Sequence, residues 1–503
     1  MATFMLLLRA GASPVTFAWK TRPLVLVLAV ISACVSTGCT TPRVEPQNAR
    51  TPAGVVCDYD VQVDSELVLT VVATFAAPLL GELALDDPAM PFVEAVTVIG
   101  AAGRAPAARG KSGYAVSCAS SCRVEYRFRL RDAAARIADV DTAIALGAMI
   151  VAPPSTWLLR PWDASEGRYR FHVATPAGVG FASGVRPSLA RAGAYEGDLA
   201  SIGESAFSAF GGLTMLAVAP GIDAAVAGGV ELAHDDVLPW LRAELTAIRA
   251  YYESELDDRI VVLVAPGNSD VIRGKTLGGG GASVLVRLGT TTTTADLAAD
   301  WVVAHELVHV GFPALGYEHG WFSEGLATYV EPVARARRGL VSVEQVWSDL
   351  VENAPQGLPA KGDTGLEGTD AWGRVYWGGA LYFLLADLTI REQTRGRRSL
   401  DDALRAVAAT GANVETRWTL EKVLDVGDRA TGTRVLHDLH VRFGTSPGTV
   451  DLPALWARLG VRRSAAPPPS IEFDDAAPAA HFRKAITAAN PVESPVRIEK
   501  HAE

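Results

Sequence analysis

The most constraining feature of the sequence is the segment His305-Glu306-Leu307-Val308-His309, in which two histidines stand four residues apart. Residues at this spacing share one face of an α-helix, with Cβ atoms ~5–6 Å apart. Two such imidazoles can bind one Zn²⁺, and Glu306 then projects beside the metal, where it can accept a proton from water. The motif also arises by chance in core helices. A catalytic zinc centre needs a third protein ligand, which the rest of the sequence has to supply.

The third ligand is predicted to be Glu324. A metzincin arrangement fails, because its glycine and its ligand would fall on Phe312 and Leu315. Residues 320–329, GWFSEGLATY, instead resemble the second zinc helix of the gluzincins, where a W-x-x-E-G-x-[AT]-x-Y segment supplies a glutamate ligand. Glu324 holds the matching position. Two nearby residues, Glu318 and His319, are rival ligands, and the residues around Glu324 favour it over both.

The resemblance continues downstream. Residues 374–381, RVYWGGAL, look like the V-Y-x-K-G-A segment of the glycyl aminopeptidase family and, more distantly, of aminopeptidase N relatives. The tyrosine of that segment donates a hydrogen bond to the tetrahedral oxyanion, so the resemblance gives this role to Tyr376. Gly378 replaces the lysine of the pattern, and Arg374 either orients substrate or, as we expect, is solvated. The resemblance covers residues 57–462.

This resemblance implies a gluzincin metallopeptidase that acts on a peptide or protein substrate. One Zn²⁺ per chain is held by His305, His309 and Glu324, and Glu306 is the general base. In these families a glycine-rich strand carries a glutamate that grips the free amino group of the substrate. The corresponding stretch here, Gly279-Gly280-Gly281-Ala282, has no acid. We expect it to bind the substrate backbone by edge pairing, with either endopeptidase or aminopeptidase-like specificity.

Two other hypotheses belong to different classes of protein. The first is a catalytically silent gluzincin-fold envelope lipoprotein that acts as a binding or assembly factor, and the missing acid motivates it. The presence of Glu306 and Tyr376 weighs against this hypothesis. The second is a structural lipoprotein with a coincidental motif, which would bind no zinc.

The first part of the chain is predicted to be rich in β-strands. Residues 66–73, 92–99, 122–130 and 168–174 alternate apolar with polar side chains and are enriched in Val, Tyr and Phe. This pattern favours an antiparallel β domain, a sandwich. The stretch 132–146 is either a helix or a loop.

After about residue 195 helical spacing dominates. Helices are predicted over 235–255, 295–310, 321–338, 343–351, 376–391 and 400–409. Residues 260–265 form a fully apolar strand, and a four-glycine run at 278–281 leads into a second strand at 283–288. Gly274-Lys275-Thr276 between them is not a P-loop, because six residues rather than four separate it from Gly267.

A chain of 503 residues is long enough for several domains. The predicted fold class is a multidomain α+β protein with an N-terminal antiparallel β-sandwich, a thermolysin-like gluzincin catalytic domain and a C-terminal helical domain. The expected organisation is a lipoprotein signal peptide over 1–38, a tether over 39–56, a β domain over 57–195, a zinc peptidase domain over 196–390, a helical domain over 391–463 and a disordered tail over 464–503.

The N-terminus is predicted to direct export. A basic stretch precedes an apolar run over 24–35, which is shorter than the ~20 residues of a membrane-spanning helix. The small residues directly before Cys39 resemble a bacterial lipobox, which implies lipidation of Cys39; the alternative is an ordinary signal peptide. Thr40, in place of an aspartate, favours the outer membrane over the inner membrane. We therefore expect a lipid-anchored protein of the bacterial cell envelope, on the periplasmic side.

Export places the remaining cysteines in an oxidising compartment. Cys118 and Cys122 can form a short disulfide, and Cys57 can pair with either one, so an odd thiol remains in every case. The formal net charge of −10 argues against a nucleic-acid partner, because nucleic-acid binding needs a basic face.

Overall fold

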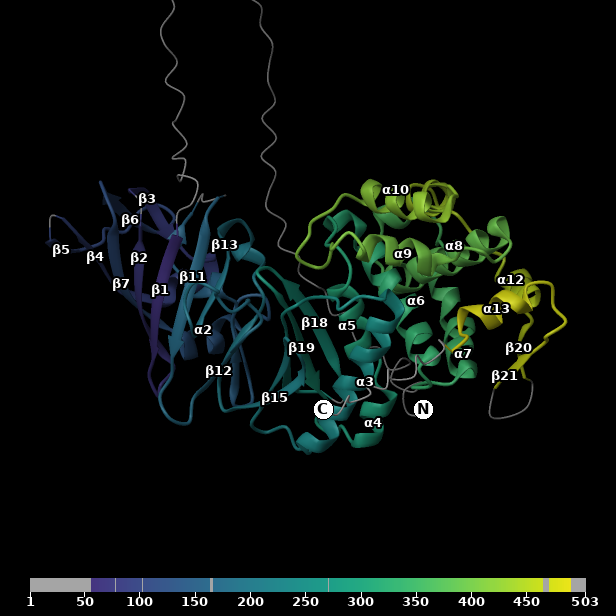
Figure 1. The fold of residues 1–503 in the computed structure, drawn as a ribbon, viewed down its shortest axis with the longest axis horizontal. Coiled ribbons are helices and arrows are strands. Elements are labelled where there is room, and N and C mark those ends of the chain that lie inside the picture. Colours follow the sequence, from purple (N-terminus) through teal and green to yellow (C-terminus); the bar gives the residue numbers. More distant parts are fainter. Residues whose placement is uncertain are drawn as a thin grey trace, which may run out of the picture. The chain divides into compact units, whose positions relative to one another are not determined.

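The structure of the protein is a computed structural model that describes residues 56–489, apart from residues 77, 102, 163–165, 270 and 465–469. The predicted signal peptide, Cys39 and all but the last residue of the tether lie outside the described residues. The chain is a mixed α/β protein with a β-rich N-terminal part and a helical C-terminal part (Figure 1). Among the described residues, no helix has the length and apolar character needed to cross a membrane.

The β-rich part contains a seven-stranded sheet in the order β13-β11-β1-β2-β7-β4-β5. Its strands are β1 (Val56–Val63), β2 (Val68–Phe75), β4 (Val93–Gly100), β5 (Gly103–Pro106), β7 (Cys122–Arg129), β11 (Arg168–Ala174) and β13 (Ala194–Asp198). Side chains on β2 and β7 alternate between buried and more accessible positions, as the sequence pattern predicts. The purely antiparallel prediction is wrong at one place: β1 and β11 pair in parallel. Parallel neighbours need a long crossover, and residues 64–167 supply it.

A second sheet of three strands shares the core of the first. It comprises β3 (Leu79–Ala84), β6 (Tyr114–Cys118) and β10 (Arg160–Pro161). Leu83 and Val116 of this sheet belong to the same buried cluster as Tyr59 and Val71 of the larger sheet. The stretch 132–146, left open by the sequence, contains most of helix α2 (Leu130–Ile137) and strand β8 (Ile144–Leu146).

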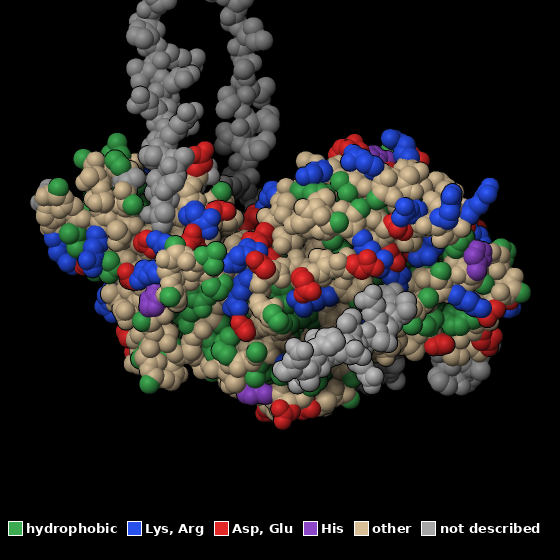
Figure 2. Space-filling model, in the orientation of Figure 1, with side chains coloured by type: hydrophobic (Ala, Val, Ile, Leu, Met, Phe, Trp, Pro, Cys, Tyr) green, Lys and Arg blue, Asp and Glu red, His purple; other side chains and the backbone are tan. Residues whose placement is uncertain are grey.

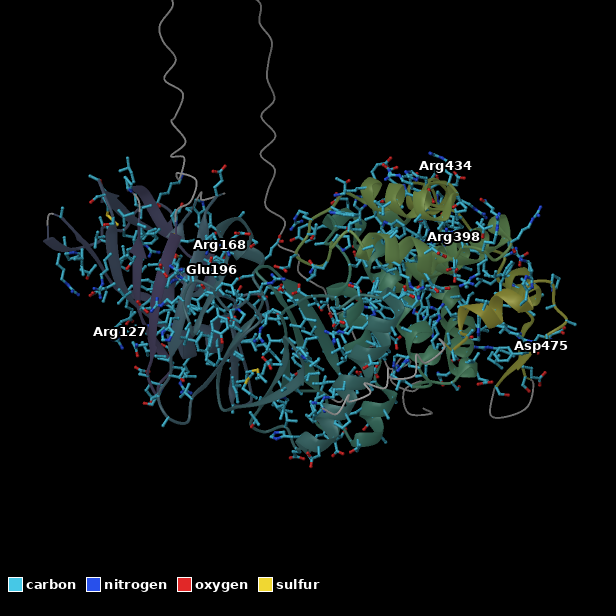
Figure 3. The ribbon with its side chains drawn as sticks, in the orientation of Figure 1. Arg127, Arg168, Glu196, Arg398, Arg434 and Asp475 are labelled. Carbon is cyan, nitrogen blue, oxygen red and sulfur yellow. A yellow bond between two sulfur atoms is a disulfide. The ribbon has the colours of Figure 1, made fainter. Side chains whose placement is uncertain are left out.

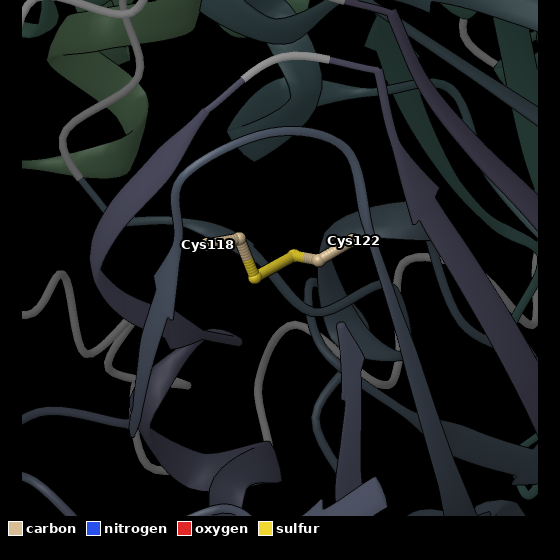
Figure 4. Close-up of a disulfide and its surroundings, with 2 residues drawn as sticks. All are labelled: Cys118 and Cys122. Carbon is tan, nitrogen blue, oxygen red and sulfur yellow. A yellow bond between two sulfur atoms is a disulfide. The ribbon is translucent and has the colours of Figure 1, made fainter. Parts of the chain in front are cut away.

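Covalent and ionic links tie neighbouring strands of the β-rich part together. Cys118 and Cys122 form a disulfide across the turn between β6 and β7 (Figure 4), with Cα atoms 5.9 Å apart. Cys57 is the odd thiol; burial raises its pKa to about 12. Arg168 on β11 and Glu196 on β13 form an ion pair at 2.5 Å (Figure 3). On the face shown in Figure 2, acidic and basic side chains are intermixed.

The helical part begins on a five-stranded sheet in the order β15-β16-β17-β19-β18. Its strands are β15 (Leu213–Ala219), β16 (Ile222–Ala227), β17 (Ile260–Pro266), β18 (Arg273–Gly278) and β19 (Ala282–Leu288). The inner strands β16, β17 and β19 are parallel, whereas β18 runs antiparallel to β19 and forms one edge.

This sheet is covered on both faces, which explains why β17 is apolar throughout. Val262 of β17 packs in the core that contains the helices, and Leu263 packs in a second core. The second core also contains residues of a four-stranded sheet made of β8, β9 (Met149–Val151), β12 (Gly180–Ser183) and β14 (Ser208–Gly211). Helix α3 (His234–Tyr252) and helix α5 (Val302–Val310) contribute to the first core.

The remaining helices follow the predicted pattern with one correction. They are α6 (Gly320–Arg337), α7 (Val343–Asn353), α8 (Gly379–Thr394), α9 (Leu400–Ala408), α10 (Leu420–Thr431), α11 (Val435–Leu439) and α12 (Leu452–Leu459). The single helix predicted over 295–310 is two helices, α4 (Thr294–Ala299) and α5. The chain breaks at Asp300, whose carboxylate accepts hydrogen bonds from the backbone N–H groups of Val302 and Val303 and so begins a new helix.

The prediction of a disordered tail over 464–503 is wrong for residues 470–489. Strand β21 (Ile471–Phe473) pairs with β20 (Val461–Arg463), and helix α13 (Ala480–Ile486) follows. Arg483 of α13 is buried and donates hydrogen bonds to the backbone oxygens of Leu459 and Gly460. The Pro/Ala-rich composition of the segment gives no indication of this strand pairing or of these hydrogen bonds.

Candidate metal centre

The structure brings His305, His309 and Glu324 together. Glu324 Oε2 lies 3.1 Å from His305 Nε2 and 3.6 Å from His309 Nε2. One potential ligand atom from each residue lies within 4.8 Å of the other two. Two imidazole nitrogens and one carboxylate oxygen form a donor set of the catalytic zinc type, which leaves a fourth position open. The residues present therefore fit a zinc ion.

Two glycines allow α6, the helix that carries Glu324, to approach α8 closely. Glu324 lies near the start of α6, and α6 packs on α8. At the crossing Gly325 faces Gly379, and a Cβ on either glycine would collide with the backbone of the other helix. The glycine after Glu324 is thus required by helix packing, and the same contact draws the start of α8 towards the metal ligands.

Electrostatics hold the carboxylate of Glu324 in its ionised form. Burial alone would raise the pKa of Glu324, but the facing His309 and His305 rings lower it well below its usual range. Burial alone would lower the pKa of His309, yet the carboxylates of Glu324 and Glu306 raise it. Each group stabilises the charged form of its partner. A metal cation bound among these groups therefore stabilises the carboxylate of Glu324 in the way that a protonated His309 otherwise does.

Glu306 is positioned by strand β18. The hydroxyl of Thr276 lies 2.7 Å from Glu306 Oε2 and donates a hydrogen bond to it. Gly274, two residues earlier on the strand, is so close that an added Cβ would lie 2.5 Å from Glu306 Cγ. The side chain of Glu306 is therefore fixed between α5 and the edge strand, directly beside the ligand His305.

Tyr376 lies against the ring of His305. It belongs to a π-helical segment, Arg374–Gly378, directly before α8; such segments occur frequently at functional sites. Its ring stacks on that of His305, with centroids 5.9 Å apart and planes inclined by 17°. Burial, with the negative charge of Glu324 and Glu306, raises the pKa of Tyr376 above its usual range. The hydroxyl thus stays protonated and can act as a hydrogen-bond donor.

Arg374 is not solvated, contrary to the sequence-based expectation. It is buried, its Nε lies 3.0 Å from Asp363 Oδ2, and its Nη1 lies 2.5 Å from the backbone oxygen of Gly357. These bonds hold the π-helical segment against the preceding loop. Arg374 therefore has a structural role.

The rival ligand His319 is engaged elsewhere. Its Nδ1 lies 2.8 Å from Glu367 Oε2, and His440 Nε2 contacts the other oxygen of the same carboxylate at 2.8 Å. Glu318 is exposed. Of the three candidates for a third ligand, only Glu324 meets the two motif histidines.

The predicted substrate-binding stretch does not lie at the histidines. Gly279, Gly280 and Gly281 form the turn between β18 and β19, and Ala282 begins β19. Their backbone groups already bond to neighbours: Ala206 donates to Gly279, Arg186 donates to Gly280, and Gly281 donates to Glu415. At ~3.3 Å per residue, Gly279 is ~16 Å along the chain from Gly274. The exposed edge beside Glu306 is β18 itself.

Sequence reasoning missed four residues at the site. Gly274 and Thr276 contact Glu306, and in the sequence their signal is the Gly274-Lys275-Thr276 segment, whose spacing excludes a P-loop and indicates no other role. The exposed rings of Trp301 and Trp372 contact His305 and Tyr376, with centroids 5.3 and 5.1 Å apart. The sequence indicates Trp301 only as part of the apolar body of the HExxH helix, and no pattern points to Trp372.

Comparisons with known proteins find a similar fold but no similar sequence. The sequence matches no family profile and no curated protein. In structure, the chain is similar to an aminopeptidase N family protein from Idiomarina loihiensis, with a TM-score of 0.62 and 13% identity over 81% of this chain and 79% of that chain. An M1 zinc metallopeptidase mutant from Deinococcus radiodurans, bound to a Tyr-Ser-Ala substrate, gives a TM-score of 0.48 and 15% identity over 79% of this chain and 95% of that chain. The chain thus shares the fold of the Idiomarina protein.

Proposed function

We propose that the protein is a zinc-dependent peptidase of the gluzincin type. The observation that carries the proposal is the convergence of His305 and His309 on Glu324, with Glu306 and Tyr376 beside them. The fold shared with an aminopeptidase N family structure agrees with this assignment. The part of the substrate that binds along β18 determines whether the peptide is cleaved at its end or within its length.

The mechanism assigns one task to each side chain. His305, His309 and Glu324 would hold a zinc ion, which would supply Lewis acidity to the scissile carbonyl and to water. Glu306 accepts the proton of the attacking water and then delivers it to the leaving amine. The Tyr376 hydroxyl donates a hydrogen bond to the carbonyl oxygen as negative charge develops there.

The substrate backbone is proposed to pair with β18. This strand is the last in its sheet, so its outer edge has backbone N–H and C=O groups that no described strand of the sheet uses. An extended peptide added there gains main-chain hydrogen bonds, and its side chains alternate between the two faces of the sheet. Gly274 of β18 abuts Glu306, so a peptide paired with this strand would run close to the general base.

Metal content tests the proposal directly. We expect about one zinc per purified chain, and hydrolysis of a peptide library that a chelator abolishes and added Zn²⁺ restores. His309→Ala should lose the metal, whereas His319→Ala is the matched control, because His319 bonds to Glu367 instead. Less than a few tenths of an equivalent of zinc after mild purification would contradict the proposal.

We further propose that the protein is exported and anchored to the bacterial envelope through a lipid on Cys39, on the outer-membrane side. The support is the sequence pattern of the N-terminus. Cys39→Ala is expected to abolish metabolic labelling with radioactive palmitate and to move the protein from the membrane to the soluble fraction. Equal labelling of the variant and the natural protein would overturn the anchor.

A further inference from the structure

Two arginines without a counter-ion among the described residues face each other across the edge strand β18 and its neighbour β19. Arg273 on β18 is directly opposite Arg287 on β19, and the pKa of Arg287 is lowered by burial and by the charge of Arg273. Within the part of the chain that the structure describes, neither guanidinium has a hydrogen-bond or ion-pair partner. Every other described arginine that is not exposed has one. Arg287 is thus the exception in a protein that pairs its buried cations.

This arrangement is costly for the fold. Like charges directly opposite each other on antiparallel strands repel, and a half-buried cation without a counter-ion loses hydration that no protein group replaces. Neighbouring Lys275 shows the usual solution, since it pairs with Asp141 at 2.8 Å. A cost of this kind at a proposed active site is expected where the missing partner is supplied by a ligand.

The arginines lie where a substrate paired with β18 would pass. Gly274 and Thr276 face Glu306, so the alternate residues Arg273 and Lys275 project from the opposite face of the sheet. Arg287 shares that face, because it pairs in register with Arg273. Arg273 is adjacent in sequence to Gly274, the residue that abuts the general base. A substrate side chain or terminus on this face would be within a few residues of the scissile bond.

We propose that Arg273 and Arg287 form a subsite for a carboxylate of the peptide substrate. The inference rests on the proposed peptidase function and names its substrate class: peptides with an acidic side chain or a free C-terminal carboxylate near the cleaved bond. Paired guanidiniums suit a carboxylate because they offer charge-assisted hydrogen bonds in a planar fork. Such a subsite also gives β18 an electrostatic anchor of the opposite sign to the amine-gripping glutamate that the resembling families carry.

Matched peptides test the subsite. One set differs only by Glu against Gln at each position, and a second differs only by a free or an amidated C-terminus. We expect the protein to cleave one carboxylate form with a kcat/KM at least tenfold above its neutral partner. Preference in the first set identifies a side chain and preference in the second set a terminus. Equal rates within every pair would overturn the proposal.

Two variants assign the preference to these residues. Arg287→Gln and Arg273→Gln should reduce it to about twofold or less, because kcat/KM falls more on the carboxylate peptides than on their neutral partners. Arg338→Gln, an exposed arginine outside the site, should keep the full preference. Equal losses on charged and neutral peptides in the Arg287 variant would overturn the subsite. Because like charges are relieved, the Tm of the Arg287 variant should be unchanged or higher.

Binding separates failure of the subsite from failure of the proposed function. In a Glu306→Gln protein, calorimetric titration with the same peptides measures affinity without hydrolysis. Tighter binding of the carboxylate forms supports the subsite if Arg287→Gln abolishes this difference in affinity. This conclusion holds even if the natural protein cleaves nothing. Equal affinity for charged and neutral forms overturns the subsite, even if zinc-dependent cleavage is observed.

Discussion

Glu306→Gln is expected to reduce peptide hydrolysis by about 10²–10⁴-fold while leaving the metal in place. Glutamine keeps the size of the side chain and can still accept the hydrogen bond from Thr276 through its amide oxygen. It cannot accept a proton from water at neutral pH. The variant thus removes the general base without disturbing its surroundings.

The measurement is kcat/KM on one peptide substrate together with zinc content and Tm. Glu318→Gln is the matched control, because the same change falls on an exposed glutamate just before α6. We expect full zinc and an unchanged Tm for both variants, and full activity only for the control. Unchanged turnover in Glu306→Gln would refute the mechanism, whereas loss of zinc would show that Glu306 acts on the metal instead.

The grouping of His305, His309 and Glu324 could be predicted from the sequence because most of its geometry is local. The spacing of His305 and His309 fixes them on one face of a helix, and the pattern around Glu324 is carried by one short segment. The glycine in that segment is now explained by the contact of Gly325 with Gly379. Strand alternation likewise identified β2, β7 and β11 near their observed bounds.

Features that depend on distant partners could not be predicted. The glycine run and β18 are neighbours in sequence, but only the hairpin register decides which of them faces Glu306. Gly280 and Gly281 have φ values of +73° and +131°, so they form the turn, and a glycine run is as typical of a turn as of a backbone-binding strand. The partner of Arg374, Asp363, is identified only by the folded loop, so the sequence alone places this arginine in solvent.

The break between α4 and α5 shows the same limitation at shorter range. An apolar helical pattern runs through residues 295–310, and one carboxylate, that of Asp300, ends it by capping a new helix. The helix that begins after the break, α5, packs against β18. Helix propensity averaged over the whole segment does not reveal a capping residue in its middle. That cap nevertheless positions His305 and Glu306.

Tyr376→Phe is expected to lower kcat by about 10²–10³-fold with little change in KM. Phenylalanine keeps the ring that stacks on His305 and on Trp372, so the packing of the π-helical segment should persist. Only the hydroxyl is lost. Burial and the neighbouring carboxylates keep that hydroxyl protonated by raising its pKa, so in the natural protein it is available as a donor when charge develops on the substrate oxygen.

The effect should appear in kcat because a hydrogen bond that strengthens as the oxyanion forms stabilises the transition state more than the bound substrate. The control is Tyr114→Phe, which removes a hydroxyl from β6, where it donates to the backbone oxygen of Val93. That variant should keep kcat. A rise in KM with kcat unchanged in Tyr376→Phe would mean that the tyrosine binds substrate in its ground state, and the role of oxyanion donor would then pass to another group beside His305.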